Sequence, residues 1–236
     1  MFKESLRRHP VPYKESTPVI REFFIENDCP YEKPWFFVDV LTAIEYAKTF
    51  PFLRLLDRLD QIRLLRRVTI SCYLLHYTFV GERQDLSKLL FPDGSGLHAP
   101  PERFELAFRK VCKGVVNLAT TMIKARVDVR EYVLLKAIVL CNPAVSDLSP
   151  SAQKLLTEER ARYGQTLFDY CMVQRGVTEG PSRFAALLNI LEQLEQLAQK
   201  DKDFYVLLAA SPHDDFILPY PKGHTSNRLM LEVMDV

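Results

Sequence analysis

Apolar residues recur at intervals of three and four along most of the chain, which is the spacing of one face of an α-helix. In the first such stretch they stand at positions 37, 40, 41 and 44, and Pro51 is expected to stop or kink this helix. A second helix is predicted from about Leu59 toward Gly81. Further helices are predicted over residues 102–126, 129–141, 149–174, 181–210 and 228–236. The pattern therefore predicts an all-α fold.

The predicted helix that ends near Gly81 is amphipathic in its first turns and apolar on nearly every side afterwards. A helix of this kind needs cover all round, so we expect it in the middle of the molecule. Its apolar run from Val68 to Val80 is too short to span a bilayer, which argues against a membrane protein. His76, within this run, is interpreted as a hydrogen-bonded core histidine, with a ligand contact as the less favoured alternative.

Two breaks in the helical pattern are rich in proline. Residues 91–101 predict a turn or a short hairpin within one domain, because the helices on either side cannot bury their apolar faces alone. Residues 211–227 predict a loop. Ser149 followed by Pro150 predicts a capped helix start. We therefore expect residues 1–236 to form a single domain.

Composition and charge narrow the function classes. Hydrophobic residues make up 47% and charged residues 26% of the 236 residues, as in ordinary globular proteins. The 31 Lys and Arg residues balance the 30 Asp and Glu residues, which argues against a dedicated nucleic-acid-binding domain. The five cysteines are too far apart for a Cys-x-x-Cys zinc site, and we expect them to be mostly reduced, buried and intracellular.

No catalytic motif is found. The sequence has no Gly-x-Gly-x-x-Gly, Walker, Gly-x-Ser-x-Gly or His-Glu-x-x-His pattern. His213, Asp214 and Asp215 are better explained as a solvated loop than as a metal site, because no further ligand stands at a suitable spacing. We therefore expect neither an enzyme nor a metal centre.

Four stretches resemble the ligand-binding domains of nuclear hormone receptors. The first is the family signature in AKTFPFLRLLDRLDQIRLLRR, whose fixed positions are occupied by Lys48, Pro51, Asp60, Gln61, Leu64 and Leu65. Residues 131–149 and 183–199 resemble the family's eighth and tenth helices, and residues 229–234 resemble its activation helix. The sequence is most similar to the nematode supplementary receptors related to hepatocyte nuclear factor four. The resemblance implies a three-layer antiparallel α-helical sandwich.

The resemblance also implies a surface for coactivator or corepressor peptides of the Leu-x-x-Leu-Leu type. Lys48 and Glu232, both expected at the molecular surface, would hold the two ends of a partner helix by their charges. The full surface would comprise Ile44, Lys48, Gln61, Ile62, Leu65, Leu229, Glu232 and Val233. The activation helix is too short to be stable alone, so its docking would act as the switch. The alternative is that both charges are simply solvated.

A pocket for a lipophilic ligand, such as a fatty acid or a sterol-like molecule, is implied as well. Positions that match the family's pocket linings are Phe36, Asp39, Val40, Ala43, Ile70, Tyr73, Leu74, Tyr77, Phe204 and Leu207. These side chains are bulky, so any cavity is expected to be small, and plain core packing is an equally favoured interpretation. Many family members hold an acidic ligand with an arginine near the end of the fifth helix. That position is Val80 here, with Arg83 nearest, which disfavours a carboxylate ligand.

The late helix carries Leu187, Leu191, Leu194 and Ala198 at spacings of four, three and four, which is the pattern of a helix–helix seam. The seam either packs inside the chain or forms the homodimer or heterodimer contact that the resemblance implies. No four-cysteine zinc-finger module is found, so we expect no direct DNA binding by this chain.

The function implied by the resemblance is that of a ligand-regulated transcription factor module that acts in the nucleus. The alternative is a ligand-independent module for dimerisation and cofactor recruitment, in which side chains fill the pocket.

Overall fold

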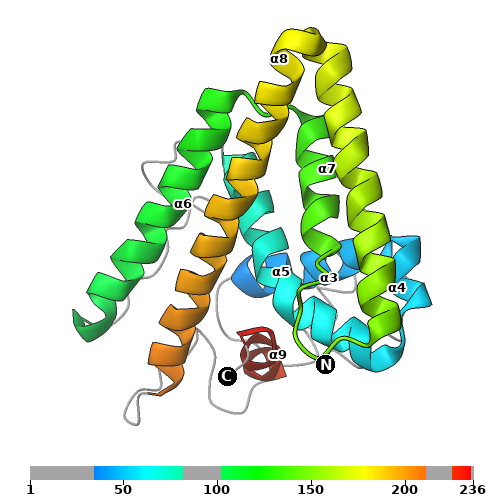
Figure 1. Ribbon diagram of the computed structural model, residues 1–236. Helices are drawn as coiled ribbons and strands as arrows, with labels where there is room; N and C mark the ends of the chain where they lie inside the picture. Colours follow the sequence, from blue (N-terminus) through cyan, green and yellow to red (C-terminus); the bar gives the residue numbers. More distant parts are fainter. Residues whose placement is uncertain (1–34, 82–101, 211–224, 235–236) are drawn as a thin grey trace.

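The computed structural model describes residues 35–81, 102–210 and 225–234, and these residues form only helices and short connections (Figure 1). In chain order the elements are α3 Trp35–Lys48, α4 Pro51–Leu55, α5 Arg58–Gly81, the 3-10 turn η1 Glu102–Phe104, α6 Glu105–Ala125, α7 Val129–Leu140, α8 Pro150–Ala209 and α9 Thr225–Met234. The prediction of an all-α fold is confirmed. The turn predicted at 91–101 and the loop residues His213, Asp214 and Asp215 lie outside the described residues.

The ends of the helices follow from local signals in the sequence. Pro51 does more than stop the first helix, because α3 ends at Lys48 and the proline is the first residue of α4. Ser149 caps α8 as predicted, and its Oγ accepts a hydrogen bond of 3.2 Å from the backbone N–H of Ala152. The last helix begins at Thr225, so residues 225–227 are helical and not part of the predicted loop.

Helix α5 crosses the middle of the molecule, between α3 on one side and α6 with the late part of α8 on the other (Figure 1). It also packs against α7 and α9. Its second half is covered on all sides, as expected, and Ile70, Cys72 and Leu75 are completely buried. This stacking is the three-layer helical sandwich that the sequence predicts.

Helix α8 folds back on itself into two antiparallel halves (Figure 1). The break is at Gly176, whose backbone adopts φ 76° and ψ 178°. Gly180 lies at the same corner, where an added Cβ atom would stand 2.6 Å from Sδ of Met172. The rings of Phe168 and Phe184 pack edge to face across the two halves, with centroids 5.4 Å apart. The two helices predicted over 149–174 and 181–210 are these halves.

Arg183 joins three helices at one end of the molecule. Its Nε donates to Oε1 of Glu131 on α7 at 2.7 Å, and its Nη1 donates to the backbone oxygen of Ala125 on α6 at 2.5 Å. Glu131 also completes the capping box of α7 with Asp128. The end of α6, the start of α7 and the corner of α8 therefore meet at one apex (Figure 1).

Two residues of the family signature connect α5 to its neighbours. Asp60 accepts hydrogen bonds from the backbone N–H of Ser149 at 3.0 Å and from its hydroxyl at 2.5 Å, which links the starts of α5 and α8. Gln61 donates from Nε2 to the backbone oxygens of Leu53 and Leu56, both at 2.9 Å. Gln61, which is predicted in the coactivator surface, therefore also holds α4 against α5.

The corner of α8 provides a test of the architecture. Gly176→Ala should lower the free energy of unfolding by about 1–2 kcal/mol, because an L-residue is strained at a positive φ. Gly164→Ala is the matched control, since an added Cβ there meets no atom within 4 Å. This change inside a helix should raise stability by about 0.5–1 kcal/mol. Circular dichroism during urea denaturation measures the unfolding midpoint of each variant. A shift of both midpoints in the same direction would contradict the backbone conformation described at Gly176.

Candidate functional site

A polar cluster lies around Tyr73 of α5, with one carboxyl from α3 and one from the late part of α8 acting on it. We call it the acidic–phenolic cluster and define it as Asp39 of α3, Tyr73 and Tyr77 of α5, and Asp201 of α8. The two tyrosine rings have centroids 5.9 Å apart. Burial raises the pKa of Tyr73 well above its ordinary value, and the charges of both aspartates raise it further. Both carboxyl groups therefore act on the same phenol.

Asp201 is a buried carboxyl with one oxygen that is unpaired among the described residues. The residue is 6% exposed, and its Oδ2 makes no hydrogen bond with any residue that the structure describes. Burial raises its pKa from 3.8 to about 7. The ammonium of the adjacent Lys202 donates to the backbone oxygen of Arg66 at 3.4 Å. Burial raises the pKa of Cys112 on α6, and the charge of Asp201 raises it further.

Asp39 of α3 is partly buried, and its charge also acts on Tyr73. Burial raises its pKa to about 7, while the cation of Lys136 on α7 opposes the rise. Lys136 is itself buried, with its ammonium 4.1 Å from the ring centroid of Tyr46 and 3.4 Å from the hydroxyl of Tyr132. No ion pair joins Asp39 to Lys136 within the described residues, so the two charges interact only at longer range.

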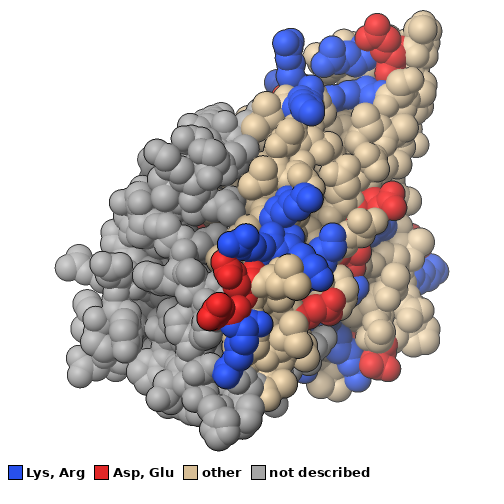
Figure 2. Space-filling view, turned by 90° about the vertical axis from the view of Figure 1, so that its left-hand side faces the viewer, with Lys and Arg blue, Asp and Glu red and all other residues tan. Residues whose placement is uncertain are grey.

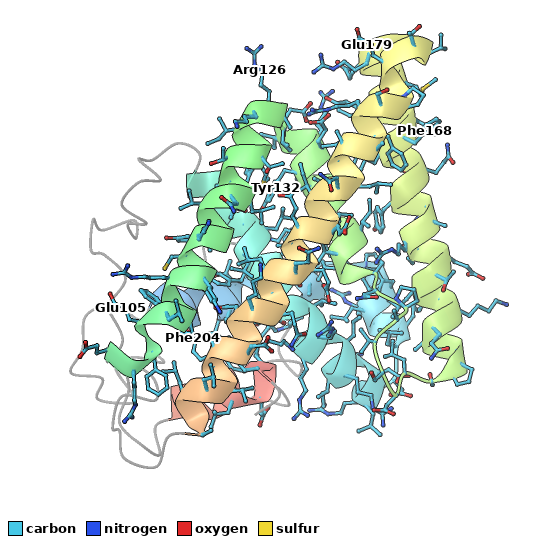
Figure 3. The ribbon with its side chains drawn as sticks, turned by 60° about the vertical axis from the view of Figure 1, so that its left-hand side comes forward. Glu105, Arg126, Tyr132, Phe168, Glu179 and Phe204 are labelled. Carbon is cyan, nitrogen blue, oxygen red and sulfur yellow. The ribbon has the colours of Figure 1, made fainter. Side chains whose placement is uncertain are left out.

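His76 has the partner that its interpretation as a core residue requires. Its Nδ1 lies 2.8 Å from the hydroxyl of Tyr132 on α7, which is labelled in Figure 3. Burial lowers the pKa of His76 to about 4, and the nearby cation of Lys136 lowers it further. The imidazole is therefore neutral near pH 7, and its hydrogen bond supports the core interpretation over a ligand contact.

Late in α8, the predicted pocket residues separate into one buried and one exposed side chain. Phe204 is 7% exposed and packs against Phe108 of α6, with ring centroids 5.7 Å apart, at the end of the molecule where α6 begins (Figure 3). Leu207 is 50% exposed, so its prediction as a pocket residue is wrong. The helix buries positions 204 and 208, and this turns position 207 toward solvent.

The remaining predicted pocket positions do not distinguish a cavity from a packed core. Four of them are fully or almost fully buried, namely Val40, Ala43, Ile70 and Leu74. Both interpretations require this burial, so these positions remain predictions. The side chain of Phe36 and the position of Arg83 lie outside the described residues.

The predicted coactivator surface is largely covered. Ile44 and Leu65 are 0% and 1% exposed, and Leu229 and Val233 of α9 are equally buried, while Ile62 and Glu232 are partly exposed. Helix α9 packs against α5 and α8. Its buried residues explain why so short a helix can be ordered.

Lys48 is not a surface cation, so that expectation is wrong. It is 5% exposed, and its ammonium donates to both carboxylate oxygens of Glu45, one helical turn earlier, at 2.9 and 3.0 Å. This pairing compensates for part of the cost of removing the charge from water. A partner helix could meet this ammonium only after the local contacts rearrange.

The seam predicted on the late helix packs inside the chain. Leu187, Leu194 and Ala198 are at most 5% exposed, and Leu191 is partly buried against the same core. The first of the two alternatives therefore holds for these residues, and they are not available to a second subunit. The outer face of the same stretch is largely polar, with Leu188 as a partly exposed apolar residue.

The charged groups on the described surface do not form a candidate site for catalysis or for a metal ion. Basic and acidic side chains lie near one another on the face shown in Figure 2, with uncharged areas between them. Within the described residues, no group of three His, Cys, Asp or Glu side chains is arranged to hold a metal ion. None of the described helices has the length and apolarity needed to cross a membrane.

The comparison with protein families decides the assignment. The family described as "Ligand-binding domain of nuclear hormone receptor" matches residues 34–208. The chain belongs to this family. Among nuclear hormone receptor family members of Caenorhabditis elegans, nhr-60 is 39% identical over 178 residues, which are 75% of this chain and 38% of that protein. Member nhr-153 is 40% identical over 180 residues, which are 74% of this chain and 43% of that protein.

The fold comparison agrees with this assignment. The ligand-binding domain of Ultraspiracle from Drosophila melanogaster superposes with a TM-score of 0.62 at 20% sequence identity, covering 84% of this chain and 77% of that one. At this identity the likeness concerns the fold. The matched part of this nuclear receptor domain spans about two fifths of the length of the two nematode relatives. Members of the family are receptors and not enzymes, which confirms that expectation.

Asp201 is not among the residues predicted from the sequence, although a signal for it is present there. The buried stripe of the late helix runs through Leu194, Leu197, Asp201, Phe204 and Leu208 at spacings of three and four. An acidic residue on such a stripe is either buried or distorts the packing, so it can be identified without a structure. Lys136 was missed for a different reason, because its ammonium lies over the ring of Tyr46 on α3, which is far away in the sequence.

The burial of Asp201 predicts a pH-dependent gain in stability on its replacement. The native carboxyl keeps its proton up to about pH 7, whereas the unfolded one releases it near 3.8. Its contribution to stability is therefore full below about pH 4 and is lost as the pH rises through 7. The stability of Asp201→Asn relative to the parent should rise between pH 4 and pH 8, by up to about 4 kcal/mol at 1.36 kcal/mol per pKa unit.

Urea denaturation at pH 4 and pH 8 measures this difference. Asp203→Asn, an exposed aspartate on the same helix, is the matched control and should show no comparable change between the two pH values. Equal pH profiles for the parent and Asp201→Asn would mean that the carboxyl is not buried as described.

Proposed function

We propose that this nuclear receptor domain binds a lipophilic molecule between α3, α5, α6 and the late part of α8, and that the ligand controls the docking of α9. The observation that carries the proposal is the position of α9. It buries Leu229 and Val233 against α5 and α8, the two helices that also carry Tyr73, Asp201 and Phe204. A ligand in contact with these helices would therefore act on the surface that α9 needs.

The physical basis is the marginal stability of a short helix. Helix α9 has 10 residues, fewer than an isolated helix needs in water, so its order depends on docking. A ligand that binds better when α9 is docked shifts the population toward that state by its difference in affinity. This is how binding inside the domain would reach the surface.

We propose further that the docked α9 and the end of α3 recruit a Leu-x-x-Leu-Leu helix of a coregulator. Such a helix leaves unpaired N–H groups at its start and unpaired C=O groups at its end. Glu232 and Lys48 have the charges that favour these two ends. The pairing of Lys48 with Glu45 adds a condition, because the ammonium must turn away from that carboxylate to reach a partner.

Opposite effects of Lys48 and Glu45 would test this arrangement. Lys48→Gln should weaken binding of a labelled Leu-x-x-Leu-Leu peptide by about 1 kcal/mol or more, because a charge at the helix end is lost. Glu45→Gln breaks the same ion pair but leaves the cation in place, so it should preserve or strengthen binding. Fluorescence anisotropy measures both affinities, and thermal unfolding reports any shared loss of stability.

If Lys48 is only a structural partner of Glu45, the two variants should lose stability alike and bind the peptide alike. That result would contradict the clamp. Glu232→Gln should behave as Lys48→Gln does in the binding assay, and Glu179→Gln, at an exposed site on the corner of α8, should leave binding unchanged (Figure 3).

The alternative function is a ligand-independent module whose interior is filled by its own side chains. The near-complete burial of Val40, Ala43, Ile70 and Leu74 fits it as well as it fits ligand binding. Native mass spectrometry of the purified chain separates the two functions. A retained mass that is released by organic solvent supports ligand binding, whereas a bare chain that recruits the peptide at full affinity supports the alternative.

The wider roles follow from the family and belong to the same proposal. Nuclear receptor domains of this kind typically dimerise and bind coregulators. A dimer of this chain would have to use a surface other than the Leu187–Leu194 seam. We propose that the domain acts in the nucleus as part of a ligand-regulated transcription factor. In this proposal the described residues do not contact DNA.

A further inference from the structure

The apex of the molecule carries exposed apolar side chains. Val173 and Val177, which stand before and after the break at Gly176 in α8, are 79% and 80% exposed. On α7, Val129 and Val133 are 55% and 43% exposed. Single exposed valines are ordinary, but a group of them on one surface marks a place where another molecule binds.

Tyr170 connects the exposed valines of the two helices. Its hydroxyl donates to Oδ2 of Asp128, the residue before α7, at 2.8 Å, and the guanidinium carbon of Arg130 lies 5.9 Å from its ring centroid. Val173 follows Tyr170 by three residues and Val133 follows Arg130 by three, so each lies one helical turn from this contact on the same side of its helix. We define the apical patch as Val129, Arg130, Val133, Tyr170, Val173 and Val177.

Exposed cations surround the apical patch. Lys and Arg side chains gather at the apex, at the top of the face shown in Figure 2. Within residues 122–133 and 170–183, the exposed charged residues are Lys124, Arg126, Arg130, Arg175, Asp128 and Glu179. Asp128 already accepts hydrogen bonds from two backbone N–H groups of α7 and from Tyr170, and Arg183 is paired with Glu131. The apex is therefore net positive around an apolar centre.

The combination of valines and cations distinguishes among anionic partners. A DNA backbone presents phosphates to a protein, and these gain nothing from exposed valines. Binding in a membrane interface uses mainly Trp, Phe and Leu, and none of these types belongs to the apical patch. A protein segment with both carboxylates and apolar side chains would use both parts of the surface. Tyr and Arg, which the patch also contains, are the side chains that most often dominate protein interfaces.

We propose that the apical patch docks an acidic segment of another protein, in which Asp or Glu alternates with large apolar residues. Its carboxylates meet the exposed arginines and lysines, and its apolar side chains pack on the valines and on Tyr170. The patch lies at the opposite end of the molecule from α9 (Figure 1). It is therefore separate from the proposed coregulator surface, and this inference does not rest on ligand binding.

Three fluorescein-labelled peptides test the chemistry of the partner. The first repeats Asp-Phe-Asp-Leu, the second has Asn in place of every Asp, and the third has Ser in place of every Phe and Leu. Fluorescence anisotropy with the purified chain should show the first binding at least about tenfold more tightly than either of the others, because each of those lacks one contribution. An excess of unlabelled Leu-x-x-Leu-Leu peptide should not displace it.

Substitution of the valines tests the place of binding. Val173→Ser combined with Val177→Ser should weaken binding of the first peptide at least about tenfold, because apolar surface at the centre of the patch is lost. Val206→Ser is the matched control, since this valine is 46% exposed near the other end of α8. It should leave the affinity unchanged. Thermal unfolding should be similar in all three proteins, as is usual for surface changes.

Substitution of the arginines tests the charge contribution. Arg130→Gln combined with Arg175→Gln should weaken binding at least about tenfold and make the remaining affinity less sensitive to salt. Lys154→Gln, at an exposed site near the start of α8, is the matched control and should behave as the parent does.

Several outcomes would overturn the inference. They are failure of the acidic peptide to bind the parent, equal binding of the three peptides, and affinity that survives both pairs of substitutions. A mixed-sequence DNA duplex and phosphatidylserine vesicles are the competing partners. Tighter binding of either one than of the peptide, lost in the arginine pair but kept in the valine pair, would identify a phosphate-binding surface instead.

Discussion

The need to cover the second half of α5 on every side arranges the rest of the domain. Among the described helices, α3, α6, α7, α8 and α9 pack against α5, so a buried polar side chain on it must find its partner inside the protein. Thr69 and Thr78 do so by donating to the backbone oxygens of Leu65 and Leu74, one turn earlier. His76 reaches across to a tyrosine of α7. Nε of Arg66 on α5 and Oδ2 of Asp201 in the acidic–phenolic cluster are exceptions, because these buried atoms have no hydrogen-bond partner among the described residues.

Three residues of the family signature make structural contacts within this chain. Asp60 holds the start of α8, Gln61 holds α4, and Lys48 pairs with a glutamate on its own helix. All three bonds are made within one chain. A match to the signature therefore establishes the fold directly, and a role in recruiting partners needs an additional rearrangement.

Most of the fold could be predicted because its signals are local. The periodicity of apolar residues gave the helices, and Ser149 with Pro150 gave the start of α8, since a cap depends only on residues within one turn. The covered state of α5 followed from its apolar surface. The start of α9 was missed because its first residues carry no apolar pattern.

The site was less predictable because it depends on contacts between distant segments. Nothing next to Lys48 in the sequence shows that the residue is buried, and the orientation of Leu207 depends on which face of α8 meets α6. The leucine seam of the late helix is a second example of a contact that the sequence alone does not identify. Its spacing correctly indicates a packing face, but only the fold shows that the partner is the chain's own core.

The apex at Arg183 has a mechanical consequence for the opposite end of the molecule. The guanidinium fixes the ends of α6 and α7 against the corner of α8, whereas α9 lies far from this point (Figure 1). The second half of α8 runs from this corner to Ala209 and is about 50 Å long at about 1.5 Å per residue. A helix fixed at one end moves most at the other. A tilt of only about 5° at the apex would move the far end of α8 by about 4 Å, roughly three residues of helix rise, beside the helix that must dock.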